Sequence, residues 1–251
     1  MSKERSDSAP APTGREPRRA DEGHAPAATS RSEIDEFLNR VKSLGSAVST
    51  GARGRLIFAL DATMSRQATW DLAQSLQARM FQVAADLGGL DVQLVYFRGF
   101  SECRASKFVS GGQGLGELMS KIEVRGGATQ IGKVLSHTRD EARRAKVGAL
   151  VFVGDAMEES IDRLLAKAGE LAIVGVKAFM FQEGDDADAA RAFQEIARLT
   201  GGAYGAFDAS AAHRLEALLR AAAAYAAGGR AGLEAQALKE DAARLLLRQM
   251  R

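Results

Sequence analysis

Short apolar runs that alternate with helical patterns are the feature that most limits the folds open to this chain. The runs at 56–60 and 149–154 consist almost wholly of large, β-branched or small apolar residues, and a helical pattern follows each of them. Continuous apolar runs of this length are typical of parallel strands that are buried on both faces. Since strand and helix patterns continue to alternate along the chain, we expect an α/β fold with a mostly parallel sheet.

Six strands and their order follow from this pattern. The second and third strands are separated by only three residues, and the third is rich in charged residues, so we expect it to be an antiparallel strand at the sheet edge. Right-handed crossovers then favour a doubly wound sheet of order 3-2-1-4-5-6 with helices on both faces. The expected strands are 55–61, 90–98, 102–109, 149–154, 173–181 and 203–207. The expected helices are 66–87, 115–122, 129–144, 159–171, 188–199, 211–227 and 233–250.

Composition divides the chain into four regions. Residues 1–30 contain all four prolines and no Leu, Ile, Val, Phe, Tyr or Trp, so they cannot bury enough surface to fold and we expect a disordered tail. Residues 31–54 form a short amphipathic helix and a linker. Residues 55–229 contain the α/β domain, and 230–251 a C-terminal helix.

Charge and hydropathy exclude several classes of partner. The 34 basic and 32 acidic residues give a net charge of +2, which is too balanced for a protein that binds nucleic acid. The N-terminus lacks the apolar segment of a secretion signal, and no apolar run approaches the roughly 20 residues that a membrane span needs. The single cysteine, Cys103, excludes an internal disulfide. We therefore expect a cytoplasmic protein that binds neither nucleic acid nor a membrane.

Oxygen-bearing side chains follow the first and fourth strands of the expected sheet. Asp61, Thr63 and Ser65 leave the first strand together, and Asp155 comes directly after the fourth. These strands are neighbours in the expected order, so their ends meet at the crevice where the strand order reverses. Thr129 opens the helix that leads into the fourth strand.

The Thr129 loop must return over the sheet to join the other two turns. Its glycine pair, Gly126 and Gly127, would let the backbone approach closely enough. The complete donor set then holds two carboxylates and three hydroxyls. Such an all-oxygen set suits Mg²⁺, with Mn²⁺ or Ca²⁺ as alternatives, and argues against zinc, which prefers nitrogen and sulfur.

These three turns, in order and spacing, resemble the metal-ion-dependent adhesion site of von Willebrand factor type A domains. The resemblance spans about 55–229 and rests on the sequence Asp-Ala-Thr-Met-Ser at 61–65, the Thr129 loop and the Gly-Asp pair at 154–155. It implies that Thr63, Ser65 and Thr129 bind Mg²⁺ directly, while Asp61 and Asp155 act mainly through water. The chain departs from the commonest pattern at Thr63, usually serine, and at Met64, usually glycine.

The resemblance also implies a function. Domains of this kind bind proteins without catalysing a reaction, and a partner protein donates an acidic side chain to the metal. Intracellular members often act with ATPases or chaperone-like machines, so an adaptor role in such a complex is expected. This expectation is an analogy of family rather than a deduction from the residues.

Other interpretations remain open. Ser65, Thr129 and Asp155 are also preferred helix caps. Glu158 and Glu159 suit the positive end of a helix or an outer role beside Asp155. The acidic residues at 183–186 indicate a solvated loop at the same end of the sheet.

Two alternative functions also remain. A phosphohydrolase of the haloacid-dehalogenase type also begins with an aspartate after a buried strand and ends with a Gly-Asp pair, although it requires Asp-x-Asp and position 63 is threonine. Alternatively, the leucines of the terminal helix drive self-association, which would make the chain a structural component of a complex.

Overall fold

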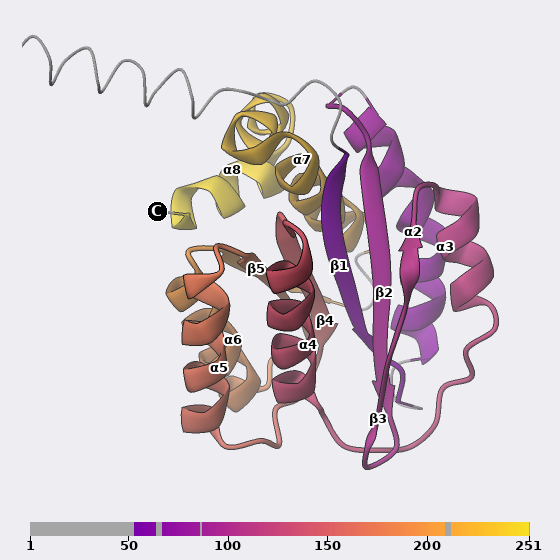
Figure 1. Cartoon of the computed structure of the whole chain (residues 1–251), viewed down its shortest axis with the longest axis vertical. Coiled ribbons are helices and arrows are strands. Elements are labelled where there is room, and N and C mark those ends of the chain that lie inside the picture. Colours follow the sequence, from indigo (N-terminus) through magenta and orange to yellow (C-terminus); the bar gives the residue numbers. More distant parts are fainter. Residues whose placement is uncertain (1–52, 64–66, 86, 209–211, 251) are drawn as a thin grey trace, which may run out of the picture. The chain divides into compact units, whose positions relative to one another are not determined.

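The computed structural model describes residues 53–63, 67–85, 87–208 and 212–250, which form a six-stranded sheet flanked by helices (Figure 1). The strand order is β3-β2-β1-β4-β5-β6, and all pairs are parallel except β2 with β3. The strands are β1 (Gly54–Asp61), β2 (Leu90–Arg98), β3 (Glu102–Val109), β4 (Ala149–Gly154), β5 (Lys177–Glu183) and β6 (Ala203–Phe207). The predicted fold class, strand order and antiparallel edge are thus confirmed.

Helices cover both faces of the sheet, as predicted. The described helices are α2 (Gln67–Ala85), α3 (Gly112–Met119), α4 (Ile131–Arg144), α5 (Ile161–Ile173), α6 (Ala187–Thr200), α7 (Ala212–Ala237) and α8 (Asp241–Gln249). One apolar core lies under α2, α3, α7 and α8, and a second lies under α4, α5 and α6. In β1, Phe58 and Leu60 point into the first core, whereas Ile57 and Ala59 point into the second. Burial on both faces explains why residues 56–60 of this strand are all apolar.

Some of the sequence predictions cannot be followed into the structure. The predicted tail at 1–30 and all but the last two residues of the predicted helix and linker at 31–54 lie outside the described residues. No described helix is both long enough and apolar enough to cross a membrane.

The fifth strand begins four residues later than predicted. Ile173 is the last residue of α5 and is 87% exposed, because Gly175 adopts φ 77° and turns the chain before the strand starts. The apolar residues at 173 and 174 continue the helix, so their hydrophobicity was wrongly assigned to the strand. The strand consequently extends to Glu183 at its carboxyl end.

The C-terminal region also differs from the prediction. Helix α7 does not stop at 227 but continues through a kink at Gly229 (φ 61°) to Ala237, and α8 starts only at Asp241. Leu233 of α7 and Leu246 of α8 are both buried in the first core. A turn at 238–239 replaces the single straight helix that was expected, and the two short segments pack on the same core.

The amino ends of the central strands are covered by α7, which lies with α8 at the top of Figure 1. A Cβ atom on Gly54, at the start of β1, would lie 2.3 Å from the carbonyl oxygen of Ala226. Gly148, just before β4, also borders Ala226. Glycine at the strand starts therefore lets the backbone of α7 pack directly on the sheet. The carboxyl ends of the strands lie at the opposite end of the sheet, where loops follow them.

Candidate functional site

The carboxyl ends of β1 and β4 bring two of the predicted acids to the same end of the sheet. Leu60 pairs with Val153, so Asp61 is level with Gly154, and Asp155 follows one position later. Neighbouring strands lie about 4.8 Å apart, which places both acids at the carboxyl ends of adjacent strands. Asp61 is only 5% exposed and Asp155 is half-buried.

The turn after β1 is shaped by Asp61 itself. Its Oδ1 atom accepts a hydrogen bond of 2.8 Å from the backbone N–H of Thr63, a local bond that bends the chain back over its own strand end. Thr63 is buried beside it. Ser65, the third predicted ligand of this turn, lies outside the described residues.

The segment that leads to Thr129 is fastened to this turn and to the β2–β3 hairpin. Arg125 donates its backbone N–H to the carbonyl of Ala62 at 2.9 Å, and Ala128 donates to Gly99 at 3.1 Å. A Cβ atom on Gly127 would lie 2.3 Å from both the nitrogen and the oxygen of Gly99. The close approach at Gly127 is thus made to Gly99 of the β2–β3 turn, whereas the prediction had the glycine pair approach the ends of β1 and β4.

Thr129 is joined to the turn after β4 by a reciprocal pair of hydrogen bonds. Its backbone N–H donates to Oε2 of Glu158 at 2.8 Å, and the backbone N–H of Glu158 donates to the Thr129 hydroxyl at 3.1 Å. A hydroxyl has two lone pairs and one proton, so the Thr129 oxygen keeps a further lone pair for another partner. The segment that carries Thr129 is thus bonded both to the turn after β1 and to the turn after β4.

The helix-cap interpretation of Thr129 and Asp155 is wrong. Helix α4 has Gln130 at its N-cap and α5 has Ser160, and neither helix receives a side-chain bond from its cap residue. Glu159 occupies the start of α4 instead, because its carboxylate accepts the N–H of Gly132 at 3.1 and 3.2 Å. Glu159 therefore serves the positive end of the helix across the groove, and not that of its own helix.

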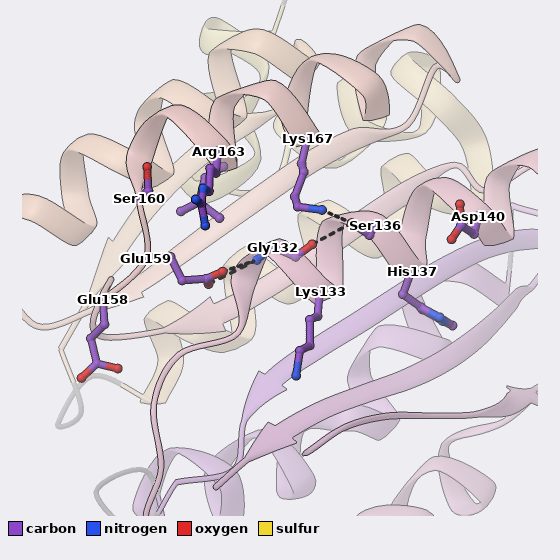
Figure 2. A pocket seen from close by; sticks show the side chains of 11 residues that line it. Gly132, Lys133, Ser136, His137, Asp140, Glu158, Glu159, Ser160, Arg163 and Lys167 are labelled. Atoms are coloured by element: carbon purple, nitrogen blue, oxygen red, sulfur yellow. Dashed lines mark hydrogen bonds between the residues drawn. The ribbon is translucent and has the colours of Figure 1, made fainter. Parts of the chain in front are cut away.

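A groove of about 710 Å³ lies between α4 and α5, beside these turns (Figure 2). Figure 2 shows Glu159 reaching the first turn of α4, with Arg163 and Lys167 extending from α5. Burial raises the pKa of Glu159, although the bonds from Gly132 and Ile131 oppose the rise. None of the four predicted metal ligands that the structure describes, Asp61, Thr63, Thr129 and Asp155, lines this groove, so the groove is a neighbour of the predicted site.

Another buried acid lies at the carboxyl end of the sheet. The sequence pattern placed it in a loop. Glu183 ends β5, is 8% exposed, and accepts a hydrogen bond from the hydroxyl of Thr69 in the first turn of α2. It is not part of a solvated loop, and Asp186 is the N-cap of α6 with a 2.6 Å bond from Ala189. If the sequence pattern had placed β5 correctly, Glu183 would have been predicted as the last residue of its strand, as Asp61 is of β1.

The donor chemistry of the joined turns suits a hard cation. In the part of the chain that the structure describes, no group of three or more His, Cys, Asp or Glu residues is arranged to hold a metal. The predicted set requires fewer acids, because hydroxyls complete it. Buried carboxylate and hydroxyl oxygens at one strand edge fit Mg²⁺ or Ca²⁺ and do not resemble a nitrogen and sulfur site.

Comparisons with known proteins give a match in structure alone. No family model matches the sequence, and no curated protein matches it either. A von Willebrand factor type A protein from Catenulispora acidiphila is 16% identical, with a TM-score of 0.54 over 69% of this chain and 43% of that one. Proximal thread matrix protein 1 from the mussel byssus, with a zinc-occupied MIDAS motif, is 17% identical, with a TM-score of 0.55 over 78% and 53%.

A third solved structure is covered almost completely. It is an aerotolerance-related membrane protein from Bacteroides fragilis, which is 18% identical with a TM-score of 0.51 over 68% of this chain and 98% of that one. Identities this low establish likeness of fold and not of activity. Together with the strand order β3-β2-β1-β4-β5-β6, they show that this chain has the fold of a von Willebrand factor type A domain.

Proposed function

We propose that this chain is a Mg²⁺-dependent protein-binding module that has no catalytic activity of its own. The observation that carries the proposal is that the Thr129 segment is bonded to both of the other predicted turns at the carboxyl end of the sheet. Arg125 connects this segment to the first turn, and Glu158 connects it to the third. These bonds, together with the pairing of β1 and β4, support a common location for the oxygens of the three turns.

Five residues would hold the ion. The hydroxyls of Thr63, Ser65 and Thr129 would bind it directly, and Asp61 and Asp155 would act mainly through water. The position of Asp61 supports this assignment, because Asp61 is buried next to Thr63 at a strand end that is level with Gly154 and adjoins Asp155. Mn²⁺ and Ca²⁺ are alternatives with the same ligand preference.

A protein partner follows from the neutral hydroxyls. When bound, the cation would supply a positive charge that the hydroxyls leave only partly compensated and that accepts one more oxygen ligand. An acidic side chain of a partner protein is the natural donor. The zinc-occupied site of the mussel protein supports a divalent ion in this fold. A cytoplasmic location and an adaptor role with an ATPase or chaperone-like complex are further parts of the proposal, drawn from family resemblance.

Calorimetry tests the cation directly. MgCl₂ titrated into the full chain should give saturable binding, and Asp61→Ala and Thr129→Val should each weaken it by about tenfold or more. Thr138→Val is the matched control, since Thr138 is a buried threonine of α4 whose hydroxyl bonds only within the helix, to the carbonyl of Val134. Absence of binding to the wild type, or unchanged affinity in Asp61→Ala, would contradict the proposal.

The phosphohydrolase alternative has a separate test. Incubation of the full chain with p-nitrophenyl phosphate and MgCl₂ should release no more product than the Asp61→Asn variant does. Turnover that disappears in that variant would favour the enzyme, because Asp61 is the residue that a dehalogenase-type mechanism would use as nucleophile.

A further inference from the structure

An exposed phenylalanine stands at the same end of the sheet as the proposed metal site. Phe100 lies in the turn between β2 and β3 and is 90% exposed. Among the described residues, the other large apolar side chains exposed to this degree are Ile173 and Leu238. Ile173 ends α5 before the start of β5, and Leu238 lies between α7 and α8. A lone exposed apolar residue needs no explanation, so the case for Phe100 depends on its surroundings.

The turn that carries Phe100 is level with the first predicted ligand. Asp61 pairs with Phe97 of β2, and the strand continues past it by one residue, Arg98, or about 3.4 Å, before the turn begins at Gly99. The β2–β3 turn therefore extends just beyond the carboxyl end of β1 and is seen at the bottom of Figure 1. Phe100 is at its tip.

Hydrogen bonds from the Thr129 segment and from α4 hold this turn in place. The carbonyl of Gly99 accepts the N–H of Ala128 at 3.1 Å, and the Gln130 side chain donates to the carbonyls of Gly99 and Glu102 at 3.4 and 3.2 Å. On the other side of Phe100, Lys133 donates its ammonium group to the carbonyl of Ser101 at 2.8 Å. The residues that flank Phe100 are therefore fixed relative to Thr129, which lowers the ordering cost of using Phe100 in binding.

Positive charge surrounds the turn. The ion pairs of residues 98–125, together with the hydrogen bond from Lys133 to the turn, involve four cationic and two anionic side chains, an excess of two positive charges. They are Arg98, Arg104, Arg125 and Lys133, with Glu102 and Glu123. Glu102 is shared between Arg98 and Arg104, and the ammonium group of Lys133 donates to neutral oxygens of Ser101 and Gln130. Complementarity therefore favours an acidic partner surface.

We propose that Phe100 is the apolar anchor of the partner-binding surface, and that the partner is an acidic protein segment in which apolar side chains flank the carboxylate that reaches the metal. The inference rests on the proposed function and adds to it the chemistry of the partner. A few rigid aromatic residues commonly carry most of the free energy of a protein interface. Phe100 is the described residue that meets this requirement at the metal end.

Selection of peptides on the full chain tests the proposal while the partner is still unidentified. A displayed library of random linear peptides is selected in MgCl₂, and the enriched sequences are synthesised and titrated. We expect Asp or Glu flanked by apolar residues, and affinity about tenfold weaker for Phe100→Ser. Ile173→Ser and Leu238→Ser, equally exposed controls elsewhere on the chain, should change the affinity by less than about twofold. Since all three side chains are exposed, circular dichroism should show each variant folded.

The same peptides separate this inference from the proposed function. Peptides that need MgCl₂ and Asp61 but bind Phe100→Ser normally would overturn the anchor and leave the metal function standing. Peptides that need Phe100 but bind equally well in EDTA and to Asp61→Ala would keep the anchor and overturn the metal function. Enrichment of basic peptides, or of no peptide that combines an acid with apolar residues, would overturn the acidic segment as the partner.

Discussion

The two ends of the central sheet are built from opposite kinds of residue. At the amino end, α7 and α8 close the strands with alanine, leucine and glycine, and Ala226 contacts the backbone at Gly54 and Gly148. At the carboxyl end, the buried carboxylates of the described residues, Asp61 and Glu183, stand at strand ends. Buried apolar groups stabilise a fold, whereas buried charge lowers stability unless it is compensated. The comparison separates an apolar end that maintains the fold from a polar end to which the proposed function assigns binding.

Both ends nevertheless use glycine in the same way. A side chain at Gly54 would meet the backbone of α7, and one at Gly127 would meet the backbone of Gly99, each at 2.3 Å. At the amino end, the close approach packs a helix on the sheet. At the carboxyl end, it brings a loop to the place where three turns meet. The same backbone property thus serves stability in one region and assembly of the site in the other.

Truncation of the apolar end should have the largest effect on the fold. Leu246 of α8 is fully buried, so Leu246→Ala should lower the free energy of unfolding by about 3 kcal/mol. Urea denaturation in EDTA measures the loss. Leu238→Ala is the matched control, because Leu238 is 85% exposed and the change should remain within about 0.5 kcal/mol. Equal losses in the two variants would remove the distinction between buried and exposed leucines of this region.

Neutralisation of the polar end should remove the metal response and spare the fold. At a Mg²⁺ concentration of 100 times the Kd, binding should stabilise the wild type by about 2.7 kcal/mol, and Asp61→Asn should lose most of this gain. In EDTA the variant should be about as stable as the wild type, because the amide oxygen of asparagine can still accept the backbone N–H of Thr63. Thermal unfolding with MgCl₂ and with EDTA measures both. A variant that is destabilised in EDTA would show that Asp61 serves the fold.

Crowding of the loop should affect both properties together. Gly127→Ala should lower the free energy of unfolding by about 2 kcal/mol, since the new methyl group meets the backbone of Gly99. It should also weaken Mg²⁺ binding, because Thr129 is displaced with its loop. The neighbouring Gly126→Ala is the control, as nothing lies within 4 Å of a Cβ atom there. Similar effects of both substitutions on unfolding and calorimetry would show that close approach at Gly127 is unimportant.

The smallest effect should be a change in pH dependence. Burial raises the pKa of Glu159 above its ordinary value of 4.5, so the folded state holds this proton more tightly than the unfolded state does. The wild type should therefore lose a little stability as the pH rises from 4.5 through the raised pKa, and Glu159→Gln should lack that loss. Urea denaturation across this range measures the difference between the two proteins.

Glu195 provides a control of opposite sign. The hydrogen bond from Arg198 lowers the pKa of Glu195, so its contribution should be lost as the pH falls through the lowered pKa. The difference between Glu195→Gln and the wild type should therefore change in the opposite direction with pH. A Glu159→Gln difference that does not vary with pH would show that this carboxyl has the same pKa in both states.

Several elements could be predicted because their causes are local. The apolar run at 56–60 specifies a strand buried on both faces, and the short connection after Arg98 specifies an antiparallel edge. The glycines of the Thr129 loop could also be noticed in the sequence, since glycine allows a loop backbone to lie close to the backbone of another segment. The metal ligands remain a prediction, and one of them, Ser65, lies outside the described residues.

Other features could not be predicted because their causes are distant. Glu183 and Thr69 are 114 residues apart, and their hydrogen bond depends on the register of β5, which hydrophobicity alone misplaced. Glu159 serves the start of α4 rather than its own helix, since the groove brings it near Gly132. The kink at Gly229 lies between Ala226 and Leu233, which are both buried in the first core, so α7 packs on that core on both sides of the kink.

By itself, the sequence determined the order of strands and helices, the edge where the polar residues gather, and the resemblance to one fold, because periodicity and short connections act between near neighbours. Only the tertiary structure decided that Glu158 joins two of the turns, that Glu183 is buried, and that Phe100 stands exposed beside them. Contacts between distant segments depend on how the layers pack, and no local pattern records that packing.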